Sequence, residues 1–182
     1  MIRVAINGFG RIGRLAFRQM ITSTEFDIVA INNKDIDGES AAYLIKYDSV
    51  HGTFHENEIN FDGNNLVIAG VKRIPLYSEL DPEKLPWKDL NVDLVLECTG
   101  AFTNYDDAYK HIKAGAKRVL ISAPGKGQMP TIVANVNDDK VTSEDIIVSA
   151  SSCTTNCLAP LLKIISDNFG VEKGFMSTIH AY

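Results

Sequence analysis

The sequence has little that would tie it to an oxidising compartment or to a membrane. Its 182 residues include only three cysteines, Cys98, Cys153 and Cys157, an odd number in a chain large enough to fold without disulfides. No uninterrupted apolar run approaches the roughly 20 residues of a membrane span. The first four residues lead directly into a strand-like segment rather than into a signal peptide. We therefore expect a cytoplasmic protein with free thiols and no membrane partner.

The chain also lacks an excess of positive charge, low-complexity tracts and internal repeats. Eighteen basic residues against twenty-three acidic ones give a formal net charge of −5 and a pI near 5.3. No general attraction to nucleic acid or to an anionic membrane follows from that balance, and we expect no dedicated nucleic-acid site. A hydrophobic content of 45 % and a mean hydropathy of −0.03 exclude a disordered or fibrous chain.

The length suits one complete domain and a remainder. At about 150 residues per domain, roughly thirty residues are left over, too few for a second core of their own. The remainder must therefore pack on the first domain or belong to something larger.

Short apolar runs rich in β-branched residues alternate with segments of helical period. Runs of this kind are typical of strands buried on both faces of a parallel sheet. A turn cluster at 62–65 between two alternating runs predicts a β-hairpin, and Pro82 and Pro86 predict an extended loop over 78–87. The fold class is therefore α/β, a doubly wound, mostly parallel sheet with a β-hairpin insertion. The expected strands are 3–6, 28–31, 94–96, 118–121 and 146–148, and the expected helices are 11–21 and 104–113.

A glycine-rich turn separates the first expected strand from the first expected helix. Gly8, Gly10 and Gly13 have the GxGxxG spacing of a dinucleotide-binding loop. Gly8 permits a tight turn, Gly10 lets a pyrophosphate approach the backbone, and Gly13 lets the helix pack closely on the strand. The free N–H groups of the helix N-terminus then face the anion. This arrangement predicts NAD binding.

The residue expected to read the cofactor ribose is not acidic. The fingerprint places an acid about twenty residues after the last glycine, where it accepts the ribose 2′-hydroxyl. Asn33 occupies that position and Lys34 follows it. An amide does not repel a 2′-phosphate and a lysine attracts one, so NAD is the expected cofactor while NADP use stays open.

A cysteine follows the last expected strand at the start of an apolar helical run. Ser151 or Ser152 would cap that helix and Cys153 would lie in its first turn, where the helix dipole favours the thiolate. Cys157 lies one turn further along and is expected to be buried, and the spacing of the two cysteines makes a poor metal site. His180, on a strand-like run over 175–180, is a candidate base. The other histidines, His51, His55 and His111, have no neighbours in the sequence that suggest chemistry.

Four segments resemble glyceraldehyde-3-phosphate dehydrogenase and match it in register over the whole chain. They are NGFGRIGR at 7–14, KYDSVHG at 46–52, SSCTTNCLAP at 151–160 and TIHA at 178–181. The resemblance implies a Rossmann domain over 1–150 and the beginning of an α+β catalytic domain over 151–182. It also implies a homotetramer and the glycolytic oxidation of glyceraldehyde 3-phosphate, with inorganic phosphate, to 1,3-bisphosphoglycerate.

The resemblance also assigns roles to single residues. Cys153 matches the nucleophile, which forms a hemithioacetal and then a thioester, and His180 matches the base. Ser152 and Thr154 flank the cysteine where the family binds substrate and phosphate. Asn33 departs from the family's usual aspartate, and Leu80 stands where many members have a basic residue, so a contact there would use the backbone. The residues implied to bind the cofactor are Gly8, Gly10, Arg11, Ile12, Gly13, Asn33, Leu80 and Ser122.

Other functions compete with this interpretation. A Cys–His acyl hydrolase would have no use for the glycine loop. Erythrose-4-phosphate dehydrogenase shares the motifs, and a cofactor-binding module without turnover would retain only the first domain's role. Family chains continue well beyond the matching histidine, so we expect the 182-residue chain by itself to bind NAD(P) weakly and to turn over little substrate.

Overall fold

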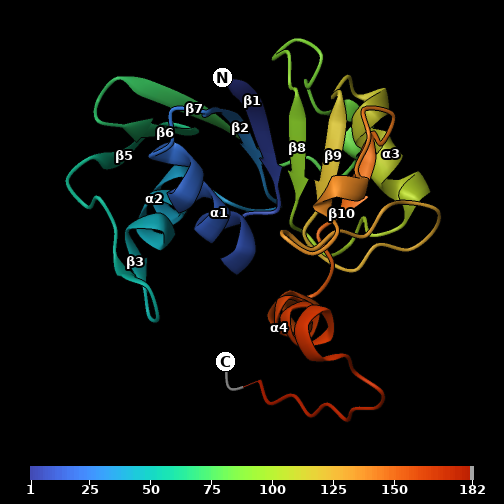
Figure 1. The fold of residues 1–182 in the computed structure, drawn as a ribbon. Coiled ribbons are helices and arrows are strands. Elements are labelled where there is room, and N and C mark those ends of the chain that lie inside the picture. Colours follow the sequence, from blue (N-terminus) through green and yellow to red (C-terminus); the bar gives the residue numbers. More distant parts are fainter. Residues whose placement is uncertain (181–182) are drawn as a thin grey trace.

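The strands predicted from the apolar runs form one large mixed sheet (Figure 1). The computed structural model describes residues 1–180. Its eight-stranded sheet has the order β10-β9-β8-β1-β2-β7-β6-β5. The strands are β1 (Ile2–Asn7), β2 (Phe26–Asn32), β5 (Ile59–Asp62), β6 (Asn65–Ile68), β7 (Lys72–Tyr77), β8 (Leu94–Glu97), β9 (Arg118–Ile121) and β10 (Ile147–Ser149).

Four α-helices, a short strand pair and two 3₁₀ turns, at Pro82–Lys84 and Asp138–Lys140, complete the described chain. The helices are α1 (Arg11–Ile21), α2 (Gly38–Lys46), α3 (Tyr105–Lys113) and α4 (Cys153–Phe169). The pair consists of β3 (Tyr47–Asp48) and β4 (Gly52–Thr53). None of the helices in this part of the chain is long and apolar enough to cross a bilayer.

The chain winds outward from β1 in both directions. It passes through α1 to β2 on one side, and it later returns to β8, β9 and β10 on the other side of β1. The strands from β10 to β7 are parallel to their neighbours, whereas β5, β6 and β7 pair antiparallel. The structure therefore confirms the doubly wound, mostly parallel Rossmann-type sheet with its hairpin insertion. The carboxyl ends of β1, β2 and β8 meet at the point where the winding direction changes.

Apolar residues of the central strand face alternate sides of the sheet. Val4 and Ile6 pack in the core beneath α1 and α2, which also contains Phe17. Ala5 belongs to the core on the opposite face, beneath α3, where Trp87 is fully buried. Because both faces of β1 are covered, its run of apolar residues is nearly continuous.

The first helix has the predicted bounds because its signals are local. Gly13, Phe17 and Met20 form its buried face. A Cβ added at Gly13 would lie only 2.1 Å from the Gly8 carbonyl oxygen, so helix and strand approach as closely as their backbones allow. By contrast, α2 has no counterpart among the predicted helices. It begins after Asp37, whose carboxylate accepts a hydrogen bond from the Ser40 N–H at 2.7 Å.

The extended loop expected over 78–87 contains a 3₁₀ turn at Pro82–Lys84. The Asp81 carboxylate accepts a hydrogen bond from the Glu83 N–H at 3.2 Å and so caps the turn. Pro82 fits at the first position because no N–H is needed there. Pro82 therefore starts a short turn that ends at Lys84, two residues before Pro86, so the segment is not extended throughout.

The strand expected over 175–180 is wrong. Residues 171–180 form no ladder with any other described residue, and all residues from 161 to 180 are exposed. A strand requires a neighbouring strand for its N–H and C=O groups, and no strand of the sheet lies beside this segment. Figure 1 shows α4 and the segment after it standing off from the sheet, beyond the carboxyl ends of the strands.

Candidate functional site

The loops that follow β1, β2, β7, β8 and β9 lie together at the carboxyl edge of the sheet. In doubly wound sheets, ligands bind outside this edge where the winding reverses. The residues implied to bind the cofactor lie in these loops or in the first turn of α1, and α4 begins on the same side of the sheet (Figure 1).

The turn between β1 and α1 is shaped by the absence of side chains. Gly8 has φ +95°, and a Cβ there would lie 2.5 Å from the Thr99 backbone nitrogen. A Cβ at Gly10, in contrast, would meet no atom within 4 Å. Gly10 is also the N-cap of α1, with no side chain capping the helix and no acid in the first turn. The loop thus presents open backbone and a positive helix end to an anion.

Two side chains of the first helical turn flank this open space. Ile12 is 53 % exposed although it is apolar and is the first residue of the apolar face of α1. Arg11 lies 3.5 Å from the Asp48 carboxylate. Hydrogen bonds from the His51 and Val50 N–H groups lower the pKa of Asp48 to about 2, so Asp48 remains a partner for Arg11 at neutral pH. Arg11 is therefore held beside the loop.

Asn33 supports the glycine loop from the end of β2. Its side-chain oxygen accepts a hydrogen bond from the Phe9 N–H at 2.8 Å, and its Nδ2 donates to the Lys34 carbonyl at 2.8 Å. The Lys34 side chain is largely exposed, and its ammonium lies 3.9 Å from the Asp35 carboxylate. At the end of β2, this corner of the edge therefore carries an amide at position 33 and a lysine at position 34.

The two remaining cofactor candidates lie on either side of the edge. Leu80 is 65 % exposed in the loop after β7. Ser122 follows β9, and its N–H donates to the Glu97 carbonyl at 2.9 Å. Its side chain is a hydrogen-bonding partner of the Cys98 thiol.

Cys153 is the first residue of α4, as the sequence predicts. The Ser152 hydroxyl caps the helix by accepting a hydrogen bond from the Thr155 N–H at 3.1 Å. Asn156 ties this turn to the sheet, since its Nδ2 donates to the carbonyls of Ala150 and Ser152 at 2.8 and 2.9 Å. Cys153 is exposed at the positive end of the helix.

His180 lies close to the same helix end. Its Nε2 is 3.0 Å from the Thr178 hydroxyl and 3.4 Å from the Thr154 hydroxyl. Cys153 and His180 line one cleft of about 320 Å³ between α4 and the segment after it. The structure therefore brings the two candidate catalytic residues to one cleft, with threonines as the hydrogen-bonding partners of the imidazole.

The expectation that Cys157 is buried is wrong. Cys157 is exposed and lines the same cleft, because no described element covers α4. The thiol that is largely buried is Cys98, whose desolvation raises its pKa from the ordinary 9.0 to about 11. Within the described residues, no group of three or more His, Cys, Asp or Glu side chains could hold a metal ion.

Sequence reasoning missed a set of buried polar residues directly behind the cofactor loops. Asn7, Asn32 and Glu97 end three adjacent strands, and all are buried, as is His111. Each strand run ends on a polar residue just before a loop, which is the one sequence signal that could have identified them. Their hydrogen bonds join strands that are far apart in the sequence, and no local pattern reveals such bonds.

Comparisons with known proteins agree on one family. A model described as the NAD-binding domain of glyceraldehyde 3-phosphate dehydrogenase matches residues 2–105, and a model of that enzyme's C-terminal domain matches residues 152–182. Similar proteins include glyceraldehyde-3-phosphate dehydrogenases of Chlamydia trachomatis serovar L2 (51 % identical over 181 residues) and Clostridium pasteurianum (50 % over 182). The alignments cover 99 % and 100 % of this chain but 53 % and 54 % of the relatives. The chain thus spans about half their length.

The three thiols should react at two distinct rates. In the folded chain at pH 8, we expect a disulfide reagent to modify Cys153 and Cys157 quickly and Cys98 only slowly, because burial raises the pKa of Cys98 and restricts access. The time course of released chromophore measures this, and full unfolding in denaturant should make all three thiols fast.

The Cys98 thiol should also make the free energy of unfolding depend on pH in the alkaline range. As pH rises from about 9 toward 11, the unfolded thiol ionises before the folded one, so the free energy of unfolding falls in that window. A Cys98→Ala variant should lose both the slow thiol and this part of the pH dependence. Three equal reaction rates in the folded chain would contradict the buried position of Cys98.

Proposed function

The chain belongs to the glyceraldehyde-3-phosphate dehydrogenase family, and from this we propose that it forms the NAD-binding half of a phosphorylating aldehyde dehydrogenase. Residues 1–150 bind NAD, and residues 151–182 begin the catalytic domain. One observation carries the proposal: an exposed cysteine at a helix N-terminus lies on the same side of the sheet as an open glycine loop.

The residues at the edge fit a dinucleotide. Gly10 leaves the space that a Cβ would fill, and the uncapped N-terminus of α1 faces it, as a pyrophosphate requires. Arg11 and Ile12 contact the cofactor from the first turn of α1. When bound, NAD supplies the acceptor for the hydride that leaves the substrate.

Asn33, Leu80 and Ser122 complete the cofactor contacts. Asn33 meets the ribose while its oxygen holds the glycine loop. Leu80 acts through its backbone, and Ser122 lies at the side of the edge nearest β10 and α4. Together with the glycine loop, these residues span the edge from β7 to β9.

Cys153 carries the covalent chemistry. Its thiolate attacks the aldehyde carbon of glyceraldehyde 3-phosphate and forms a carbon–sulfur bond, giving a hemithioacetal. His180 takes the hydroxyl proton as hydride leaves that carbon, and a thioester results. Inorganic phosphate then attacks the thioester carbon and expels the Cys153 thiolate, which releases 1,3-bisphosphoglycerate. The hydroxyls of Ser152 and Thr154 bind substrate and phosphate beside the thiolate.

The exposed apolar surface of α4 supports low turnover by this chain alone. The side chains of Ile164 and Phe169 are 61 % and 85 % exposed, and the imidazole of His180 bonds to threonines. We assign the activity to a protein in which further structure covers α4. We propose that this protein is a homotetramer in the cytoplasm. By itself, the chain is a cofactor-binding unit.

The glycine loop gives the direct test of NAD binding. We expect the chain to bind NAD in a calorimetric titration and Gly10→Ala to weaken binding by about tenfold or more, roughly 1.4 kcal/mol. The added methyl occupies the space assigned to the pyrophosphate but meets no protein atom. The free energy of unfolding of Gly10→Ala should therefore stay within about 1 kcal/mol of the parent.

The matched comparison is Gly13→Ala, which adds the same methyl 2.1 Å from the Gly8 carbonyl oxygen. We expect this change to destabilise the fold by about 1–3 kcal/mol through overpacking. If the parent chain and Gly10→Ala both fail to bind NAD, or both bind it equally, the assignment of the glycine loop is wrong.

The nucleophile is tested in a chimera that joins residues 1–182 to the remaining half of the Clostridium pasteurianum relative. We expect this protein to reduce NAD in the presence of glyceraldehyde 3-phosphate and phosphate, measured by absorbance. Cys153→Ser should lower kcat by at least about a thousandfold, because a hydroxyl is a far weaker nucleophile at neutral pH. Cys157→Ser is the control and should retain activity. Comparable losses in the two variants would refute the assignment of Cys153.

Asn33 is tested by the preference between the two cofactors. We expect Asn33→Asp to raise the ratio of the NADP and NAD dissociation constants by about tenfold or more, since a carboxylate repels the 2′-phosphate. Its oxygen can still accept the Phe9 N–H, so the loop is retained. Lys34→Ala should move the ratio in the same direction by a smaller amount. An unchanged ratio in Asn33→Asp would show that this position does not read the ribose.

A further inference from the structure

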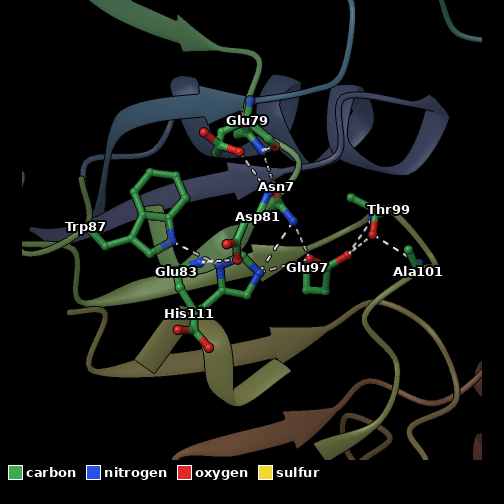
Figure 2. A network of polar contacts seen from close by, with 10 residues as sticks. Asn7, Glu79, Asp81, Glu83, Trp87, Glu97, Thr99, Ala101 and His111 are labelled. Atoms are coloured by element: carbon green, nitrogen blue, oxygen red, sulfur yellow. Dashed lines mark hydrogen bonds and ion pairs between the residues drawn. The ribbon is translucent and has the colours of Figure 1, made fainter. Parts of the chain in front are cut away.

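A buried polar network lies directly behind the loops of the carboxyl edge (Figure 2). Asn7, Asn32 and Glu97 end β1, β2 and β8, and their exposed fractions are 1 %, 4 % and 1 %. His111, on α3, and Trp87 are fully buried and extend the network across the sheet. None of these five residues is assigned a role in the proposed reaction.

The direction of the hydrogen bonds in this network is fixed by Trp87. An indole N–H can only donate, so its bond to His111 Nδ1 at 3.0 Å makes that nitrogen an acceptor. The proton of the neutral imidazole must then be on Nε2, which donates to Glu97 Oε2 at 3.1 Å. Glu97 therefore accepts from His111 and cannot donate to it.

The Glu97 carboxylate is also the acceptor in its other hydrogen bonds. Asn7 Nδ2 donates to Oε2 at 2.5 Å, and the Thr99 N–H donates to Oε1 at 2.7 Å. The Thr99 hydroxyl also donates to Oε1. Together with His111, four donors thus surround one carboxylate. A glutamine in its place would point its N–H₂ group either at the Thr99 N–H or at His111 Nε2–H, and neither of these groups can accept a hydrogen bond.

The network sets the spacing between the cofactor loops. Asn7 Oδ1 accepts from Asn32 Nδ2 at 2.7 Å, and Asn32 in turn bonds to both the N–H and the C=O of Glu79. This fixes the loop that carries Leu80. At the other end, the bonds from Thr99 hold the turn after β8, whose peptide touches Gly8.

We propose that Glu97 is a positioning residue for NAD binding, a role that rests on the function proposed above. Its carboxylate holds Asn7 and Thr99 together, and through them the glycine loop, the turn at 98–101 and the loop at 79–80. Glu97 is buried behind these loops and acts on the cofactor only through them. Without the carboxylate, the loops lose their common anchor and the cofactor edge widens.

The test is the NAD affinity of Glu97→Gln, measured calorimetrically on the 182-residue chain well below its melting temperature. We expect the affinity to fall by about tenfold or more, the scale found when a residue behind a set of ligands is replaced in metal sites. The emission of Trp87, the single tryptophan of the chain, should also change, because its partner His111 loses its acceptor.

If Glu97 only stabilised the fold, its replacement would lower the melting temperature without a specific loss of NAD affinity. A matched core variant distinguishes this structural role from the positioning role. Ile59→Ala opens a cavity in β5, the outermost strand of the sheet, and should lower the melting temperature while leaving NAD affinity unchanged. If Glu97→Gln is folded and binds NAD as tightly as the parent, the positioning role is overturned. If the parent itself does not bind NAD, the proposed function fails instead.

A second pair of variants decides the question should Glu97→Gln not fold. Thr99 is exposed, and Thr99→Val keeps the shape of the side chain but removes one donor to Glu97 together with the acceptor of the Ala101 N–H, whereas Thr99→Ser keeps both bonds. We expect Thr99→Val to bind NAD several-fold more weakly and Thr99→Ser to bind like the parent. Equal binding by the parent and Thr99→Val would then overturn the proposal.

Discussion

The close backbone approach at the β1–α1 turn is the constraint on which the rest of the structure depends. Gly13 packs against the Gly8 carbonyl, and Gly8 packs against the Cys98–Thr99 peptide, at distances that leave no room for a methyl group. These two contacts join β1, α1 and the loop after β8 into one edge. The open backbone at Gly10 lies between these two contacts in the sequence, and the buried network lies directly behind them.

Features that depend on neighbouring residues could be predicted from the sequence. The bounds of α1, the turn around Gly63 and a serine cap at 151 or 152 follow from short-range patterns, and the structure has all three, with Ser152 as the cap. The strand expected over 175–180 depended on a partner that no local pattern supplies. Likewise, α2 is short and begins with glycine, and although Asp37 caps it, its stability depends on burying Ala41 and Ile45.

In the candidate site, too, local features could be predicted from the sequence and long-range contacts could not. The spacing of the motifs located Asn33 at a strand end and Cys153 in a first helical turn. It could not show that the Asn33 oxygen accepts the Phe9 N–H. Nor could it pair His111 with Glu97 and Trp87, which lie 14 and 24 residues away in the sequence. Burial creates those bonds, since polar groups removed from water must find partners wherever the fold provides them.

Asn156 connects the segments on either side of the proposed boundary at 150–151. Its amide bonds to the Ala150 and Ser152 carbonyls and fixes the first turn of α4 to the end of β10. These bonds therefore fix the first turn of α4, which contains Cys153, relative to β10, although the proposed catalytic domain begins at residue 151. In a recombinant of two relatives, the proposed nucleophile Cys153 would therefore keep its position relative to β10 only if the crossover fell after Asn156 and not at the proposed domain junction at 150–151.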